Sequence, residues 1–141
     1  VFVTTLVYVA LRCLGAGAEH PRAARARDWL HSQPGGVLSV PTWGKFWLTL
    51  LGLYGRAGLR PLLPELALLP RAVPVHPIRF YCHTRYVYLA MSLLQGGHAR
   101  FDLGPLCAEL ERELYGPEGM PLYFREHRYH LAPADAFEPP N

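Results

Sequence analysis

Residues 42–54 read TWGKFWLTLLGLY, and this stretch decides the fold. Its apolar residues recur every three or four positions, as on one face of an α-helix: Trp43, Phe46, Trp47, Leu50, Leu51 and Tyr54. Thr42 follows Pro41 and can act as the N-cap, and Gly55 closes the pattern. The stretch therefore predicts an amphipathic helix with a largely aromatic inner face.

The same periodicity predicts four further helices, over residues 3–14, 22–31, 80–95 and 102–114. The first is expected to stop at Gly15 and to bury the face formed by Val3, Leu6, Val7, Ala10, Leu11 and Leu14. In the second, Trp29 and Leu30 are the expected inner residues, and the arginines of its outer face are expected to be solvated.

The last of these helices is expected to take Asp102 as its cap and to hold Pro105 in its first turn. Its expected inner residues are Leu103, Leu106, Cys107, Leu110 and Leu114. Its expected outer residues are Glu109, Glu111, Arg112 and Glu113.

Proline governs the connection between the third and fourth helices. Five prolines between Pro61 and Pro77 exclude a long helix there and leave at most a short turn at residues 65–69. Only Val37–Val40 has a pattern that allows a short strand, and Leu122–His130 is expected to add a turn or two. The predicted fold class is therefore all-α, built from paired helices with proline-rich connectors.

Composition limits the function. Half of the residues are hydrophobic and 12% are aromatic, but no stretch approaches the eighteen or so apolar residues of a membrane-spanning helix. The formal charge of +3 is spread along the chain without a basic stripe, which argues against nucleic-acid binding. Cys13, Cys82 and Cys107 are odd in number and far apart, which favours a reducing compartment without a disulfide framework.

A second aromatic stretch, HPIRFYCHTRYVYLAMS, covers residues 76–92. Between Asp28 and Asp102 the only acidic residue is Glu65, so both aromatic stretches lie in a carboxylate-poor region. Such a region can hold an apolar ligand, and its ring faces can stabilise positive charge on that ligand. It is poorly suited to supply a proton.

Plainer interpretations stand beside this one. Aromatic residues at helical spacing can be ordinary core, and a single histidine can be a buried, hydrogen-bonded one. His76, Cys82 and His83 lack a fourth ligand at suitable spacing for a metal, and adjacency alone does not make Cys82 and His83 a nucleophile pair. The nearby arginines can attract an anionic bilayer, cap helices or pair with distant acids.

Both stretches resemble one enzyme family. The run PTWGKFWL at 41–48 is similar to the PSWGKFWL segment of oxidosqualene cyclases, the triterpene cyclases that include lanosterol and cycloartenol synthases. Residues 76–92 resemble that family's HPxxxWCHCRxVYLPMS segment, at the same interval. Shorter likenesses at residues 8–12, 113–115 and 131–133 extend the resemblance to nearly the whole chain.

The resemblance implies an isomerase that protonates the epoxide of 2,3-oxidosqualene and cyclises it through carbocations, with no metal and no cofactor. It implies that residues 1–141 form a single partial α/α-barrel domain in the N-terminal half of a longer, two-barrel enzyme. By position, Trp43, Tyr81 and His83 resemble residues that line the cyclisation cavity, and Thr84 and Tyr88 resemble the pair that narrows the substrate channel.

The family's general acid lies in a DCTAE-like motif that does not occur in these residues, so the chain alone is expected to be inactive. The first and last residues, Val1 and Asn141, also suggest a piece cut from something longer. The implied partners are the polyisoprenoid substrate, the remaining polypeptide and a membrane surface, with monotopic attachment on the cytoplasmic face. The alternative is a non-enzymatic helical module that binds an isoprenoid or a sterol.

Several positions depart from the family pattern. Tyr81 stands in place of Trp, Thr84 in place of Cys and Ala90 in place of Pro, and Leu94 occupies a position where an aromatic residue is common. A smaller ring and an added hydroxyl change the shape and polarity of a cavity, so the product is left open. Squalene-hopene cyclases fit less well, because they lack the segment at 76–92 in this form.

Overall fold

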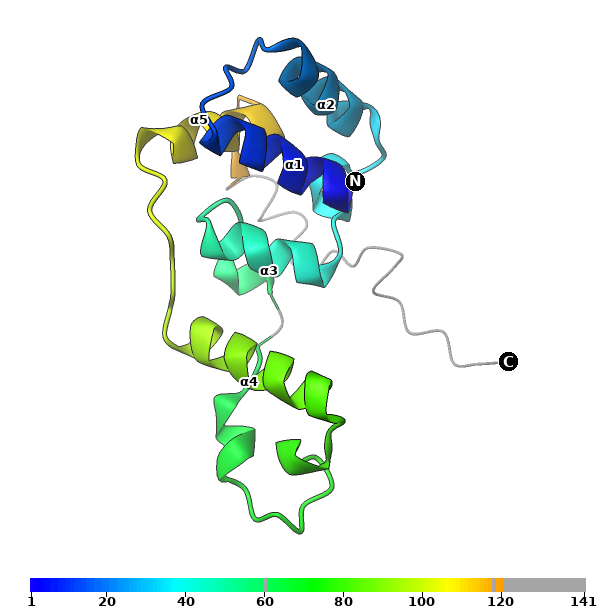
Figure 1. Cartoon of the computed structure of the whole chain (residues 1–141), viewed down its shortest axis with the longest axis vertical. Coiled ribbons are helices and arrows are strands. Elements are labelled where there is room, and N and C mark those ends of the chain that lie inside the picture. The colour runs from blue at the N-terminus through cyan, green and yellow to red at the C-terminus, as the bar shows by residue number, and fades with distance from the viewer. Residues whose placement is uncertain (60, 118, 121–141) are drawn as a thin grey trace, which may run out of the picture. The chain divides into compact units, whose positions relative to one another are not determined.

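In a computed structural model of the chain, residues 1–59, 61–117 and 119–120 are described, and every regular element among them is helical. The predicted all-α class is therefore confirmed. The described residues form two compact units (Figure 1): unit 1 contains residues 1–59 and the described residues from 100 onward, and unit 2 contains residues 61–99. The turns expected at Leu122–His130 lie outside the described residues.

Unit 1 contains four α-helices. They are α1 (Phe2–Cys13), α2 (Pro21–Ser32), α3 (Thr42–Leu50) and α5 (Pro105–Tyr115). Two 3₁₀ turns, η1 (Gly36–Ser39) and η2 (Arg56–Gly58), flank α3. The helix α1 packs against both α2 and α5, which also contact each other. The prediction of a short strand at Val37–Val40 was wrong, because η1 occupies residues 36–39 and Val40 follows it as the C-cap.

Unit 2 contains one long helix, α4 (Cys82–Gly96), and two 3₁₀ turns, η3 (Pro64–Leu68) and η4 (Pro77–Arg79). The turn expected within the proline-rich connector is present as η3. Each 3₁₀ turn has proline in its first positions, where the missing N–H removes no hydrogen bond. Among the described residues of this unit only His76, Pro77 and Ser92 are buried, so the unit has little core of its own.

The helix α1 ends at the glycine that the sequence predicts, but α3 ends early. Gly15 follows α1 at φ +90°, and Gly52 follows α3 at φ +75°. Beyond α3, Leu53 N–H bonds the Leu48 carbonyl at 2.7 Å and Gly52 N–H bonds the Thr49 carbonyl at 3.0 Å. This left-handed cap satisfies the last carbonyls and turns the chain, so α3 stops at Leu50 rather than continuing to Tyr54.

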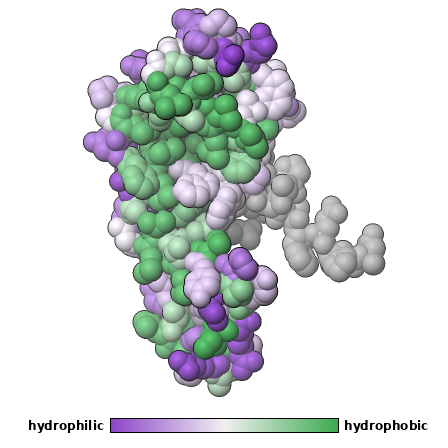
Figure 2. All heavy atoms as spheres, in the orientation of Figure 1, coloured by the Kyte–Doolittle hydropathy of each residue, from purple (hydrophilic) through white to green (hydrophobic). Residues whose placement is uncertain are grey.

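The face of α1 that is buried differs from the one predicted. Thr5, Tyr8, Val9 and Arg12 are buried, whereas Val3, Val7 and Leu14 are 68%, 49% and 85% exposed. The apolar spacing predicted the helix correctly but not its buried face. Tyr8 and Arg12 lie on the buried face instead, because Glu113 of α5 pairs their polar atoms. Figure 2 shows hydrophobic residues gathered on the surface over α1.

Other predicted contacts are corrected in the same way. Trp29 is 42% exposed, while its neighbour Leu30 is buried. Thr42 is the first residue of α3 and Pro41 occupies the N-cap position. The Asp102 carboxylate accepts a 2.7 Å bond from Gly104 N–H in the turn before α5, so it does not cap that helix.

Candidate functional site

Three aromatic rings cluster on α3 in unit 1. The Trp43 ring stacks on Phe46 with centroids 6.5 Å apart and meets Trp47 edge-on at 6.0 Å. Phe46 is buried, whereas Trp43 and Trp47 are 42% and 41% exposed. Phe46 therefore anchors the cluster, and the two indoles present ring surface outward. These faces are available to an apolar or cationic ligand.

Close packing holds α3 in place beside this cluster. A β-carbon at Gly44 would lie 2.2 Å from Val40 Cγ1 and 2.6 Å from Phe2 Cδ2, so only glycine fits between α3 and the start of α1. Lys45 is also buried, with its Nζ 5.9 Å from the centre of the Tyr54 ring. The orientation of Trp43 is thus set by a backbone that cannot shift easily.

The second predicted group lies at the start of α4 in unit 2. Tyr81 occupies the N-cap position of α4. Its ring stacks on the His83 ring, with centroids 5.3 Å apart and planes 23° from parallel. Cys82 Sγ lies 3.2 Å from His83 Nδ1. All three side chains are exposed, so an imidazole supported by a phenol ring faces outward from the helix start. This arrangement offers aromatic and imidazole faces without a carboxylate.

Tyr88 lies farther along the same helix. Its hydroxyl donates a 2.5 Å hydrogen bond to the Leu63 carbonyl, and its ring meets Phe80 edge-on at 5.5 Å. Burial, followed by the Glu65 carboxylate, raises the pKa of the Tyr88 hydroxyl, which keeps it protonated and able to donate. Thr84 is exposed one turn before Tyr88 and shares its side of α4.

The structure thus brings Tyr81 and His83 together, and it places Thr84 and Tyr88 on one side of a helix. Trp43 belongs to the other unit. A cavity that Trp43 shares with Tyr81 and His83 therefore remains a prediction.

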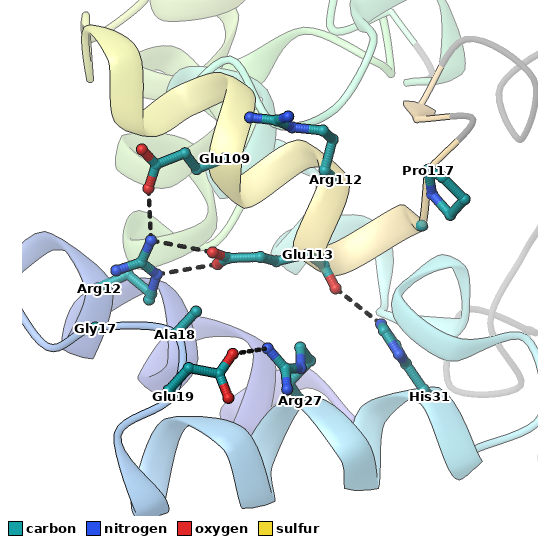
Figure 3. Close-up of a pocket in the computed structure, with 11 residues that line it drawn as sticks. Arg12, Gly17, Ala18, Glu19, Arg27, His31, Glu109, Arg112, Glu113 and Pro117 are labelled. Atoms are coloured by element: carbon teal, nitrogen blue, oxygen red, sulfur yellow. Dashed lines mark hydrogen bonds and ion pairs between the residues drawn. The ribbon is translucent and has the colours of Figure 1, made fainter.

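A charged pocket in unit 1, with a volume of about 870 Å³, was not predicted from the sequence (Figure 3). At its edge Arg12 donates to both carboxylate oxygens of Glu113 at 3.0 Å and to Glu109 at 2.7 Å. His31 Nε2 lies 2.8 Å from the Glu113 carbonyl oxygen, which joins α2 to the end of α5. The expectation that Glu113 faces water was wrong, since its side chain is only 14% exposed.

These contacts shift the pKa values of Glu113 and Tyr8 in opposite directions. Burial alone disfavours the charged Glu113 carboxylate, but hydrogen bonds from Arg12 and Tyr8 outweigh it and lower the pKa of Glu113. Burial and the adjacent carboxylate raise the pKa of the Tyr8 hydroxyl. The group is therefore an internally paired network that ties α1, α2 and α5 together. The spacing of Glu109 and Glu113, one helical turn apart, was the signal in the sequence that could have indicated a shared partner.

Within residues 1–59, 61–117 and 119–120, the requirements of a metal site, a disulfide and a membrane-spanning helix are not met. Within them no group of three or more histidine, cysteine or acidic side chains is placed to hold a metal ion. Cys13, Cys82 and Cys107 are free thiols. No helix in this part of the chain has both the length and the apolar character needed to cross a bilayer.

The sequence matches the family described as squalene-hopene cyclase N-terminal domain over residues 1–138. It is 42% identical over 139 residues to lanosterol synthase of Pneumocystis carinii. The aligned region covers 99% of this chain and 19% of that protein. The identity is 41% to lanosterol synthase of Mus musculus, with the same coverage, and 41% to cycloartenol synthase of Dictyostelium discoideum, with 97% and 19% covered. The chain thus spans about a fifth of the length of these relatives.

Proposed function

The chain belongs to the squalene-hopene cyclase N-terminal domain family, and from this premise we propose that it forms part of a cyclase acting on 2,3-oxidosqualene. In this proposal residues 1–141 contribute to one partial α/α barrel, and the proton that opens the epoxide comes from polypeptide outside these residues. The observation that carries the proposal is the pair of outward-facing aromatic groups, Trp43 on α3 and Tyr81 with His83 on α4, in a carboxylate-poor region.

The proposed chemistry follows from what these side chains can and cannot do. A cation that migrates along a hydrocarbon is stabilised by ring faces and quenched by nucleophiles or strong bases. Trp43 and Tyr81 supply ring faces, and the His83 imidazole supplies a weak base that can accept a proton at the end of the cascade. Thr84 and Tyr88 narrow the route by which the substrate reaches the cavity.

The lanosterol synthase and cycloartenol synthase relatives support this assignment by their names, and the protostadienol synthase of Neosartorya fischeri, at 42% identity, adds a third product type. Because relatives with different products are about equally similar, the product is not assigned. Tyr81 and Thr84 are the proposed determinants, since both differ from the family pattern at the proposed cavity and channel.

Membrane contact is proposed for unit 2. Leu68 and Leu93 are 84% and 68% exposed, and Ile78 is 43% exposed. Arg71 and Arg79 are exposed as well. Apolar side chains together with arginine favour an anionic membrane surface, and each arginine that reaches it contributes about 1 kcal/mol. In this proposal the membrane contact is on the cytoplasmic face of the membrane.

The proposal is tested in the full-length polypeptide that carries these residues, expressed in yeast lacking its own lanosterol synthase and assayed with 2,3-oxidosqualene. Trp43→Leu and His83→Ala should lower the rate or change the products. The matched controls are Trp47→Leu, which removes an equally exposed indole from α3, and His98→Asn, which changes an exposed histidine beyond α4. Unchanged products and rates in both test variants exclude the cavity role.

The alternative, a non-enzymatic module that binds an isoprenoid or a sterol, predicts a different result in the same assay. Binding of the substrate without turnover by the full-length polypeptide supports the module, and cyclic product supports the enzyme. Membrane contact is assayed separately by flotation with vesicles with and without anionic lipid. Leu68→Ser with Leu93→Ser should reduce flotation, and Arg71→Gln with Arg79→Gln should reduce it only for anionic vesicles.

A further inference from the structure

Two side chains of α4 hold consecutive residues of the proline-rich connector. The Tyr88 hydroxyl donates to the Leu63 carbonyl at 2.5 Å, and Gln95 Oε1 accepts from Leu62 N–H at 2.6 Å. Tyr88 and Gln95 are seven positions apart, which is two helical turns, so they project from the same side of α4. One face of the helix therefore holds the connector through backbone groups of two adjacent residues, Leu62 and Leu63.

Backbone donors are scarce at this point of the connector. Pro61 and Pro64 on either side of the gripped pair have no N–H to donate. Leu63 has the extended backbone typical of a residue before proline, with φ −78° and ψ 104°, and its carbonyl also accepts from Leu66 N–H at 3.2 Å. The direction of the Leu63 carbonyl thus depends on how residues 62 and 63 are held.

Tyr88 in turn depends on that carbonyl. Its ring meets the Phe80 ring edge-on, and this contact restrains the ring plane. Its hydroxyl, the far end of the side chain, is directed by the Leu63 carbonyl. The end of α4 also touches the connector, because a β-carbon at Gly96 would lie 3.5 Å from Pro64 Cγ, an ordinary packing distance. Helix and connector are in contact from Tyr88 to Gly96.

We propose that Gln95 is a positioning residue for Tyr88: by holding Leu62, it fixes the Leu63 carbonyl that orients the Tyr88 hydroxyl at the substrate channel. This inference rests on the proposed function, which places Tyr88 in the channel. Gln95 acts two turns away from Tyr88 and through the backbone of the connector. Loss of either bond frees the connector and lets the Tyr88 side chain leave its position.

Steady-state kinetics of the full-length polypeptide with 2,3-oxidosqualene test this coupling. Gln95→Leu and Tyr88→Phe should each change KM in the same direction, by about 2- to 10-fold, the range that one ordinary hydrogen bond represents. The kcat and the product ratio should change less, because the cavity is untouched. The double variant should show no more than the larger single effect, and Gln95→Glu, which keeps an oxygen acceptor, should restore KM.

Amide hydrogen exchange gives a second readout that does not depend on activity. In Gln95→Leu the Leu62 amide should exchange faster. Tyr88→Phe should also speed exchange of the Leu62 amide if the Tyr88 and Gln95 bonds hold the connector together. Additive kinetic effects, or unchanged Leu62 exchange in Gln95→Leu, overturn the inference. If Tyr88→Phe changes KM and Gln95→Leu does not, only this inference fails. If neither changes KM, the channel role of Tyr88 fails with it, while the Trp43 and His83 variants still decide the cyclase assignment.

Discussion

Tyr8 and Glu113 are 105 positions apart in the sequence, yet the Tyr8 hydroxyl donates a 2.7 Å hydrogen bond to Glu113 Oε2. The same carboxylate accepts a hydrogen bond from Arg12, which lies one turn farther along α1. Tyr8 is fully buried and Arg12 is 9% exposed, so these bonds are largely shielded from water. They join α1 to α5, the first and last α-helices among the described residues of unit 1.

Removing the cation from this network should destabilise unit 1. Arg12→Met keeps the apolar length of the side chain but leaves the Glu113 carboxylate without its main partner, which should cost about 3 kcal/mol. Arg22→Met, on the exposed side of α2, is the control and should change stability little. Urea unfolding of the 141-residue chain followed by tryptophan fluorescence measures both, because Trp29, Trp43 and Trp47 all lie in unit 1. Equal midpoints for the two variants would contradict the role given to Arg12.

Acid should weaken the same unit. The pKa of Glu113 in the folded chain lies below its ordinary value of 4.5, so its contribution to stability is fully present above about pH 4.5 and is lost as pH falls through the folded value. Glu113→Gln cannot titrate, so its stability should fall less steeply below pH 4.5. The unfolding free energy of both proteins, measured from neutral pH to about pH 3, tests this; parallel curves would show that other groups dominate.

A side chain at Gly52 should destabilise unit 1. Its φ of +75° disfavours other residues, and a β-carbon there would lie 2.6 Å from Arg100 Nε. Gly52→Ala should therefore cost about 1–2 kcal/mol. Gly17→Ala is the matched control, because nothing lies within 4 Å of a β-carbon at that position. The prediction fails if the two alanine variants unfold at the same urea concentration.

Tyr81 should influence the product of the proposed cyclase. Tyr81→Trp restores the residue that the family pattern carries, and it enlarges the ring that stacks on His83. In the full-length polypeptide it should shift the ratio of cyclic products formed from 2,3-oxidosqualene. Tyr86→Trp is the control, since Tyr86 is similarly exposed on α4, at 67% against 72%. A product ratio altered equally by both variants would assign the effect to the helix rather than to Tyr81.

Local patterns predicted the helices well and their ends less well. Apolar spacing located the five α-helices of the described residues, and Gly15 marked the end of α1 because a left-handed cap needs glycine. The end of α3 was placed too late because Gly52 and Gly55 are both plausible stops in sequence. Only the hydrogen bonds of Leu53 and Gly52 to the helix select the earlier one.

The candidate site residues came from the sequence, and their roles stay a prediction. The residues Tyr81, His83, Thr84 and Tyr88 were singled out through the resemblance, and the stacking of Tyr81 on His83 is new from the structure. The charged pocket was missed because Arg12 and Glu113 look like solvated charges when each helix is considered alone. Gln95 was missed because its partner, the Leu62 N–H, is a backbone group with no signature in the sequence.

The sequence by itself predicted the helices of the described residues and the resemblance to the squalene-hopene cyclase N-terminal domain family, because helical period and motif spacing are properties of neighbouring residues. Tertiary structure alone decided which face of α1 is buried and that Glu113 is paired. The physical reason is that an apolar stripe and a charged side chain each have several acceptable environments. Val3 and Val7 can stay exposed and Arg12 can be buried once Glu113, from a helix about a hundred residues away, compensates its charge.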